Sequence, residues 1–305
     1  FFKQTTAYEI SACLVGSENV YKRQIHGLVR DSEGKKMSKS IGNVIDPLDV
    51  IEGISLDKLL EKRTSSLIND KHKSNVIKKT KRDFPDGIKE FGADALRFNF
   101  CAMASTGRDI NFDLKRIEGY RNFCNKIWNA SRFILLICKD YQYKEGLNSK
   151  DSNIFDKWIL YKLDNMVADF KKYTKNYRFD LMANSIYDFV WNEYCDWYLE
   201  IAKNNSSETT KNYLIFSIVR IIKICHPIIP FITEDIWKEF YNKGFVTEQM
   251  LINSSFPTQI RISKEYDVES RVENIRDIIR KIRKIRAELS IHPVSYTHLT
   301  LPTKA

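Results

Sequence analysis

Ten residues near the start of the chain, GKKMSKSIGN at 34–43, gather charge and hydroxyl groups on one short segment. Lys36 and Lys39 supply ammonium groups, and Ser38 and Ser40 supply hydroxyl groups on either side of Lys39. Such donors stabilise negative charge on phosphate oxygens. The flanking glycines allow the backbone changes by which a loop closes over a ligand and reopens. The segment therefore predicts a loop that binds phosphate groups.

Other interpretations of this segment fit less well. A phosphate-binding P-loop requires G-x-x-x-x-G-K-[ST], and that spacing is absent from the segment. Three lysines are too few for a nuclear-localisation patch. A solvated turn would suffice for an arbitrary lysine-rich loop, but the string Lys-Met-Ser-Lys-Ser at 36–40 is specific. A chance match to five given residues in a chain of this length is expected roughly once in ten thousand chains.

The composition limits the class of protein. The 305 residues suffice for one large domain or two ordinary ones, and no apolar run is long enough for a membrane span. A net charge of +10 favours a polyanionic partner. The six cysteines form no C-x-x-C pair and the five histidines are scattered, so we expect no protein-bound metal. Unpaired thiols suit a reducing compartment, which predicts a cytoplasmic location.

The elements that must position the loop are mainly helical. Residues 25–31 predict a short strand that enters the loop, and Asp46-Pro47 predicts the first turn of a helix. Residues 57–83 read as a polar insertion whose basic section, 71–82, favours a solvated surface. Residues 91–103 predict an apolar helix, followed by a turn-rich connection at 105–113.

The rest of the chain predicts a helical bundle. Apolar residues recur at helical spacing in several segments, and we expect their aromatic side chains to lie in the core rather than to stack on bases. Thr233 is the expected N-cap of one helix, and a last helix between 271 and 291 is basic on its other side. The apolar stripes and the aromatic residues are Ile159, Leu163, Met166 and Phe170; Met182, Ile186, Phe189, Trp197 and Ile201; Val272, Ile275, Ile279, Ile282, Ile285 and Leu289; and Trp158, Trp191 and Trp237.

The pentapeptide at 36–40 resembles the second signature of the class I aminoacyl-tRNA synthetases. The resemblance continues through HGLVRDSEGKKMSKSIGNVIDPLDVIEGISL, FPDGIKEFGADALRFNFCAMASTGRDINFDLKRIEGYRNFCNKIWNASRF and WNEYCDWYLE, which look like the valine-specific branch. HPIIPFITEDIW is similar to the anticodon-domain signature of the valine, isoleucine and leucine enzymes. The similarity covers about residues 25–293.

This resemblance implies an ATP-dependent ligase that joins valine to its tRNA. Lys39 would be the catalytic residue, and Lys36, Met37, Ser38, Lys39 and Ser40 would form the ATP-binding loop. ATP would be a substrate accompanied by Mg²⁺, the partners would be tRNA, valine and ATP, and the enzyme would be a monomer without membrane contact. The first ATP signature of the family, the valine pocket and the editing domain do not occur in this sequence, so the chain alone should not aminoacylate tRNA.

The implied fold is mainly α: the C-terminal end of a Rossmann-type catalytic domain followed by an α-helical bundle. The expected ranges are a non-native tail at 1–24, the end of the catalytic domain at 25–115, a helical connection at 116–155, an anticodon-binding bundle at 156–258, a basic helix at 259–293 that leads to a missing C-terminal arm, and a second non-native tail at 294–305. Two alternatives stay open. One is an isoleucine–tRNA ligase fragment, and the other is a non-catalytic helical RNA-binding protein with a relic loop.

Overall fold

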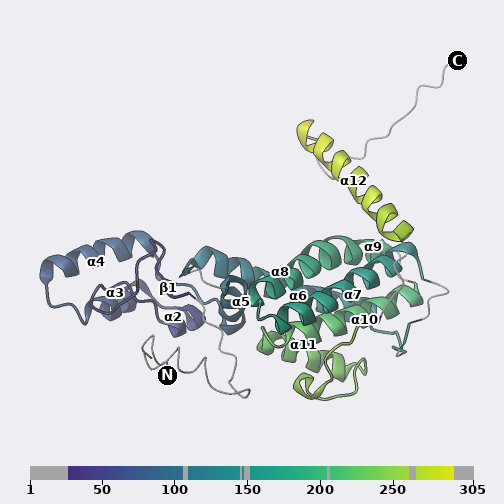
Figure 1. The fold of residues 1–305 in the computed structure, drawn as a ribbon, viewed down its shortest axis with the longest axis horizontal. Coiled ribbons are helices and arrows are strands. Elements are labelled where there is room, and N and C mark those ends of the chain that lie inside the picture. The colour runs from purple at the N-terminus through teal and green to yellow at the C-terminus, as the bar shows by residue number, and fades with distance from the viewer. Residues whose placement is uncertain are drawn as a thin grey trace, which may run out of the picture. The chain divides into compact units, whose positions relative to one another are not determined.

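A computed structural model describes residues 27–105, 109–144, 146–147, 152–204, 207–260 and 266–291 (Figure 1). The described residues are mainly helical, and they pack as two compact units. The catalytic-end unit comprises residues up to 122 together with 171–184, and the helical unit comprises 123–170 and the residues from 185 onwards. The predicted tails at 1–24 and 294–305 lie outside the described residues, and the predicted domain ranges stay a prediction.

The catalytic-end unit begins with strand β1 (Val29–Arg30), which pairs in parallel with β2 (Ile110–Asn111). Between the two strands lie α2 (Pro47–Glu52), α3 (Leu56–Thr64), α4 (Asp70–Asp83) and α5 (Ala93–Met103). Parallel strands require a crossover connection, which is usually helical, and such units build α/β domains. The strand predicted at 25–31 and the mainly helical fold are confirmed.

The predicted helix at Asp46-Pro47 is also confirmed. Pro47 occupies the first turn of α2, and the Asp46 side chain accepts a hydrogen bond from the Leu48 N–H at 3.0 Å. This cap satisfies one of the four N–H groups that a helix start leaves without a partner.

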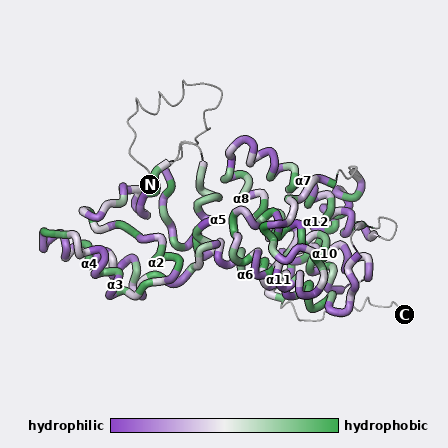
Figure 2. The backbone as a smooth tube through the Cα atoms, turned by 90° about the horizontal axis from the view of Figure 1, so that it is seen from below, coloured by the Kyte–Doolittle hydropathy of each residue, from purple (hydrophilic) through white to green (hydrophobic). Residues whose placement is uncertain are grey.

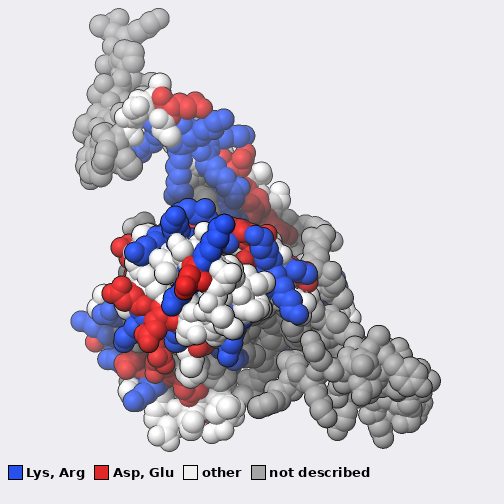
Figure 3. All heavy atoms as spheres, turned by 90° about the vertical axis from the view of Figure 1, so that its left-hand side faces the viewer, with Lys and Arg blue, Asp and Glu red and all other residues white. Residues whose placement is uncertain are grey.

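The polar insertion predicted at 57–83 folds as two contacting helices, α3 and α4. Asn69 caps α4 by accepting hydrogen bonds from Lys71 N–H and His72 N–H. Most of the basic section is exposed, as predicted, but Val76 and Thr80 are buried on one face. Hydrophilic and hydrophobic residues accordingly alternate along both helices (Figure 2). On the face of the molecule that Figure 3 shows, Lys and Arg side chains are mixed with Asp and Glu side chains.

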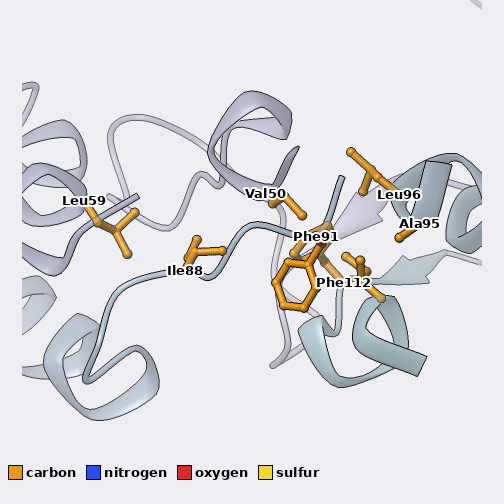
Figure 4. Packing of buried hydrophobic residues seen from close by; sticks show 8 residues of the cluster. Val50, Leu59, Ile88, Phe91, Ala95, Leu96 and Phe112 are labelled. Atoms are coloured by element: carbon orange, nitrogen blue, oxygen red, sulfur yellow. The ribbon is translucent and has the colours of Figure 1, made fainter. Parts of the chain in front are cut away.

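One hydrophobic cluster forms the core of the catalytic-end unit (Figure 4). It joins α2 and α3 to α5, and it extends over the segment between α4 and α5 and the residues around β2. Burial of apolar side chains of this size stabilises a fold by about 1.5–3 kcal/mol for each large residue. The buried members are Val50, Leu59, Ile88, Phe91, Ala95, Leu96, Phe112 and Ile117.

The remaining elements of the chain lie wholly or partly in the helical unit. They are α6 (Leu114–Ile137), α7 (Ile154–Lys175), α8 (Phe179–Asp188), the π-helix η1 (Phe189–Tyr198), α9 (Leu199–Asn204), α10 (Glu208–Cys225), α11 (Pro230–Asn242), the 3₁₀ turn η2 (Leu251–Asn253) and α12 (Tyr266–Glu288). Parts of α6, α7 and α8 belong to the catalytic-end unit. None of the described helices combines the length and the hydropathy that a membrane span requires.

The predicted apolar stripe of α7 is confirmed, because Ile159, Leu163, Met166 and Phe170 are all buried. The stripe predicted through Trp197 and Ile201 is partly wrong, since both side chains are only half-buried. The cause is η1, whose wider winding shifts the register that an α-helical period assumes. Tyr194, Cys195 and Tyr198 are buried in place of the expected positions.

The predicted N-cap at Thr233 is wrong. Helix α11 begins three residues earlier, at Pro230, whose ring has no N–H and whose fixed φ suits a first helical turn. Thr233 lies inside the helix, where its hydroxyl group donates to the Ile229 carbonyl at 2.7 Å. The Glu234 carboxylate accepts a hydrogen bond from the Leu251 N–H.

The last predicted helix forms as α12, but most of its apolar side is exposed. Val272 is buried, whereas Ile275, Ile282 and Ile285 are exposed. The buried charge on this helix is Arg276, whose guanidinium group contacts the carboxylates of Glu193 and Glu273 at 2.5 and 2.7 Å. Ion pairs of Arg276 with Glu193 and of Lys162 with Glu269, together with the buried Val272, therefore attach the start of α12 to the rest of the helical unit.

Candidate functional site

The loop at 34–43 connects β1 to α2 and begins with a tight turn. The Gly34 N–H donates to the Asp31 carbonyl and the Asp31 N–H donates to the Lys35 carbonyl, both at 2.9 Å. Gly34 has φ +76°, a backbone conformation that glycine adopts without steric cost. Lys36 then forms an antiparallel bridge with Arg30, so the chain folds back beside the strand it has just left.

Met37 fixes the middle of the loop to the core. It is half-buried and packs against the hydrophobic cluster of the catalytic-end unit. The single apolar residue of the pentapeptide therefore holds the loop down, while the residues beside it stay at the surface. This placement accounts for an unbranched, adaptable side chain at this position.

The two serines build a second turn. The Ser38 carbonyl accepts hydrogen bonds from the Ile41 and Gly42 N–H groups, both at 3.2 Å. The Ser38 and Ser40 hydroxyl oxygens lie 3.1 Å apart, within hydrogen-bond distance. Ser40 is exposed and Ser38 is half-buried, so the hydroxyl pair stands at the surface of the loop.

Lys36 and Lys39 are both exposed. Within the described part of the chain, neither ammonium group takes part in an ion pair, in contrast to the neighbouring Lys35, which contacts Glu33 at 3.1 Å. Charged ammonium groups held on an ordered turn and left without a carboxylate partner can stabilise an incoming anion. The structure thus brings together all five predicted site residues on one loop.

Two side chains that the sequence analysis missed hold this loop together. The Asn43 side chain donates to the Asp31 carboxylate at 2.9 Å and to the Lys36 carbonyl at 3.2 Å, and its oxygen accepts from the Ser38 N–H at 2.9 Å. Asn43 and Asp31 are 6% and 5% exposed. Buried polar groups with complete hydrogen bonding give a segment one defined conformation.

Asp31 is held in its charged form. Burial acts to raise its pKa, but hydrogen bonds from Asn43 and from the N–H groups of Lys35 and Glu33 outweigh burial, so the pKa lies below its usual value. A lowered pKa in the folded state contributes stability that is present above the ordinary value and lost as pH falls through the folded value. The sequence signal for this pair was small: an aspartate after a strand, and an asparagine at the end of the lysine-rich segment.

We expect the Asn43→Ala variant to loosen the loop without unfolding the unit. It removes three hydrogen bonds, and we expect the free energy of unfolding to fall by about 1–2 kcal/mol. The pKa of Asp31 should rise, because a donor to its carboxylate is lost. An NMR titration of the Asp31 carboxyl group measures its pKa, and hydrogen exchange at the Ser38 amide measures the loosening of the loop. Asn75→Ala, on the exposed side of α4, is the control, and an unchanged Asp31 pKa in Asn43→Ala would contradict this account.

The aromatic residues of the bundle divide into two groups. Trp158, Phe189 and Trp237 are buried, which confirms their predicted place in the core. Trp191 and Trp197 are half-buried and carry cations on their rings, with the Lys126 ammonium group 3.8 Å from the Trp191 ring centroid. The guanidinium groups of Arg276, Arg280 and Arg283 lie 5.0, 5.9 and 5.4 Å from the Trp197 ring centroid.

Comparison with known protein families matches both units of this architecture. Residues 3–113 match the family of class I tRNA synthetases for isoleucine, leucine, methionine and valine, and residues 156–299 match the anticodon-binding domain of tRNA ligases. The two matches together cover most of the chain, and both are to domains of class I aminoacyl-tRNA synthetases or tRNA ligases. Both matches reach into the predicted tails, whose non-native origin stays a prediction.

The similar curated proteins are bacterial valine–tRNA ligases. Those of Legionella pneumophila (strain Lens) and Francisella tularensis (strain SCHU S4 / Schu 4) are each 44% identical to the chain, over 283 and 278 residues, and the enzyme of Coxiella burnetii is 44% identical over 280 residues. Each alignment covers 88% of this chain. The chain spans 30% of the length of these relatives.

A solved structure supports the fold at lower sequence similarity. A LeuRS from Agrobacterium radiobacter K84, crystallised as a ternary complex with tRNA and LeuAMS, superposes with a TM-score of 0.52 and 16% sequence identity. The similarity covers 80% of this chain and 24% of that one. Together with the family match over residues 3–113, this likeness confirms the predicted fold, the end of a class I catalytic domain followed by a helical bundle.

Proposed function

We propose that the chain is part of a valine–tRNA ligase and that its Lys36–Ser40 loop stabilises the transition state of valine activation. The observation that carries the proposal is the pair of exposed ammonium groups on a turn fixed by Asp31 and Asn43, in a chain 44% identical to valine–tRNA ligases. The identity favours valine, and the geometry favours a role for the loop in binding phosphate.

The chemistry explains why a loop of this kind is useful. In the proposed reaction the carboxylate of valine attacks the α-phosphate of ATP, a new P–O bond forms, and the bond to pyrophosphate breaks. Negative charge grows on the α-phosphate and on the departing pyrophosphate. Positioned donors are worth most where charge develops, because they are already oriented and need no reorganisation.

Each loop residue has a distinct part in this proposal. The Lys39 ammonium group donates hydrogen bonds to the phosphate oxygens on which negative charge develops. Lys36, which precedes Met37 in the sequence, stabilises the same charge. The Ser38 and Ser40 hydroxyl groups supply weaker, neutral donors. Met37, Asp31 and Asn43 keep the loop in one conformation, so that little ordering remains to be done when ATP binds.

We expect Mg²⁺ to enter with ATP and to be held chiefly by phosphate oxygens, as is usual for this ion. The side chains that the structure describes contain no group of three or more His, Cys, Asp or Glu that could hold a metal ion. In this proposal the ammonium groups of Lys36 and Lys39 add to the charge that the metal supplies.

The helical unit is proposed to bind tRNA(Val). Residues 156–299 match the anticodon-binding domain of tRNA ligases, and the chain carries a net charge of +10. Affinity would come mostly from phosphate contacts, which weaken with salt, and base recognition would come from a few side chains. We propose a cytoplasmic, monomeric enzyme.

Amino-acid-dependent exchange of pyrophosphate into ATP tests the assignment. The full-length enzyme that contains this chain should exchange with valine, and its kcat/KM for isoleucine should be at least about 100-fold lower, since a valine pocket can exclude one extra methylene sterically. The control is the same assay with leucine. Faster exchange with isoleucine would favour the isoleucine enzyme, and no exchange with any amino acid would favour a non-catalytic RNA-binding protein.

A further inference from the structure

The two helices of the α3–α4 hairpin are joined by contacts of their own. The buried Arg63 guanidinium group donates to the buried Thr80 hydroxyl oxygen at 3.0 Å, which joins the end of α3 to the last turn of α4. The same guanidinium group lies 5.2 Å from the centroid of the Phe84 ring. The hairpin can therefore act as a rigid support for whatever packs against it.

One side of the phosphate-binding loop is attached to this hairpin by charge. Glu33 lies in the tight turn that opens the loop, and its carboxylate is 2.8 Å from the Lys79 ammonium group and 3.8 Å from the Arg82 guanidinium group. Among the basic residues described on α4, Lys79 and Arg82 pair with the loop. Lys71, Lys73, Lys78 and Lys81 are exposed.

The other side of the loop is attached by close packing. Gly42 has φ +71°, and a Cβ atom built on it would lie 2.9 Å from the Arg63 carbonyl oxygen and 3.0 Å from a methyl group of Val76. Both distances are too short for an ordinary contact, so the Gly42 backbone must rest directly on the hairpin. Val76 and Lys79 are three residues apart and share one face of α4.

We propose that the α3–α4 hairpin positions the Lys-Met-Ser-Lys-Ser loop, with Val76 and Lys79 as positioning residues that hold its two ends. The hairpin fixes residues 31–35 and 42–43, and through them it holds residues 36–41 in the conformation that meets the nucleotide. This gives a role to the basic segment 71–82, which the sequence alone leaves without one. The consequence for catalysis rests on the proposed function, whereas the consequence for loop order does not.

The two attachments should differ in strength. Lys79 and Glu33 are 33% and 40% exposed, and ion pairs of such exposure are weak because solvent screens them. Val76 is 8% exposed, and removal of its methyl groups would leave a space under the loop that water cannot fill favourably. The contribution of Val76 should therefore exceed that of Lys79.

Hydrogen exchange in the folded chain tests the positioning directly. Amide exchange reports local opening, and the Ser38, Ile41 and Gly42 amides are all hydrogen-bonded within the loop. We expect exchange at these amides to rise about tenfold in Val76→Ala and about two- to fivefold in Lys79→Met. Lys79→Arg should restore the wild-type rate, and Lys78→Met, one residue away and exposed, should leave it unchanged.

The same variants of the full-length enzyme give the catalytic readout. In single-turnover formation of the adenylate at saturating ATP, Val76→Ala should slow the reaction about tenfold and Lys79→Met about two- to fivefold. Neither variant should change the KM for valine. Equal loop exchange in Lys79→Met and Lys78→Met, with Val76→Ala also like wild type, overturns the proposal. If Val76→Ala does not fold, the Lys79 and Lys78 variants decide it.

The experiment also separates this proposal from the proposed function. Faster loop exchange without slower adenylate formation would show that the hairpin holds the loop but that this order does not matter for catalysis, which overturns the catalytic part. A wild-type enzyme that forms no adenylate would overturn the proposed function, while the exchange rates would still decide whether the hairpin positions the loop.

Discussion

Lys39→Ala should slow formation of the valyl-adenylate by about two to three orders of magnitude in the full-length enzyme, the usual effect of removing one donor that stabilises transition-state charge. The Lys39 ammonium group is exposed and has no carboxylate partner in the described part of the chain, so its substitution should leave thermal unfolding unchanged. Binding of valine should hardly change, because the proposed contact of Lys39 is with phosphate. Pre-steady-state formation of the adenylate at saturating ATP measures the effect.

Two further variants make this result specific to Lys39. Ser38→Ala should cost less than Lys39→Ala, because a neutral hydrogen bond is weaker than a charge-assisted one. Lys78→Ala removes an exposed lysine from the neighbouring α4 and should change the rate by less than about twofold. If Lys39→Ala and wild type agree within a factor of about three, the loop does not stabilise the transition state and the catalytic assignment is wrong.

The site could be predicted from the sequence as far as the loop itself. The pentapeptide at 36–40 is contiguous in the sequence, so it can be recognised before the fold is known. The Asp31–Asn43 pair could not be predicted, because its two members are twelve residues apart and are common in ordinary turns. Likewise, the contact of Gly42 with Val76 depends on the α3–α4 hairpin, which the polar composition of 57–83 concealed.

The errors in the predicted fold have local physical causes. Helical periodicity identified the stripe of α7 correctly because α7 winds with an ordinary period. The same rule failed at Trp197, since residues 189–198 wind as a π-helix and turn Tyr194 and Tyr198 inward instead. Thr233 is the predicted N-cap of α11, but the helix begins at Pro230. The rigid proline ring fixes the first turn without a side-chain hydrogen bond.

A buried carboxylate joins three elements of the helical unit at their ends. Asp156, in the first turn of α7, is 0% exposed and accepts hydrogen bonds from the Tyr198 hydroxyl at 2.7 Å and from the Thr210 hydroxyl at 3.4 Å. It also accepts from the Asn153 N–H at 3.1 Å, while Asn153 caps the Asp156 N–H in return. Tyr198 ends η1 and Thr210 lies at the start of α10, so one side chain holds three helix ends together.

Removal of this carboxylate should be the most destabilising of the substitutions considered for the helical unit. Asp156→Ala leaves the buried Tyr198 and Thr210 hydroxyl groups without their acceptor, and we expect a loss of about 3 kcal/mol in the free energy of unfolding. All five tryptophans lie within the helical unit, so urea unfolding followed by tryptophan fluorescence reports on that unit. Asp169→Ala, a half-buried aspartate on the same helix, is the control and should cost less than about 0.5 kcal/mol.

The dependence of this stability on pH distinguishes the charge of Asp156 from its shape. Burial raises the pKa of Asp156, and hydrogen bonds from Tyr198, the Asn153 N–H and Thr210 only partly oppose it. Below the ordinary pKa both states are protonated and this contribution is fully present; as pH rises through the folded pKa, the folded state loses its proton and the contribution is lost. The free energy of unfolding of wild type, relative to Asp156→Asn, should therefore increase on acidification from pH 7 towards pH 4. A difference between the two that stays constant with pH, or that shrinks on acidification, would mean that Asp156 remains charged throughout and that its hydrogen bonds outweigh its burial.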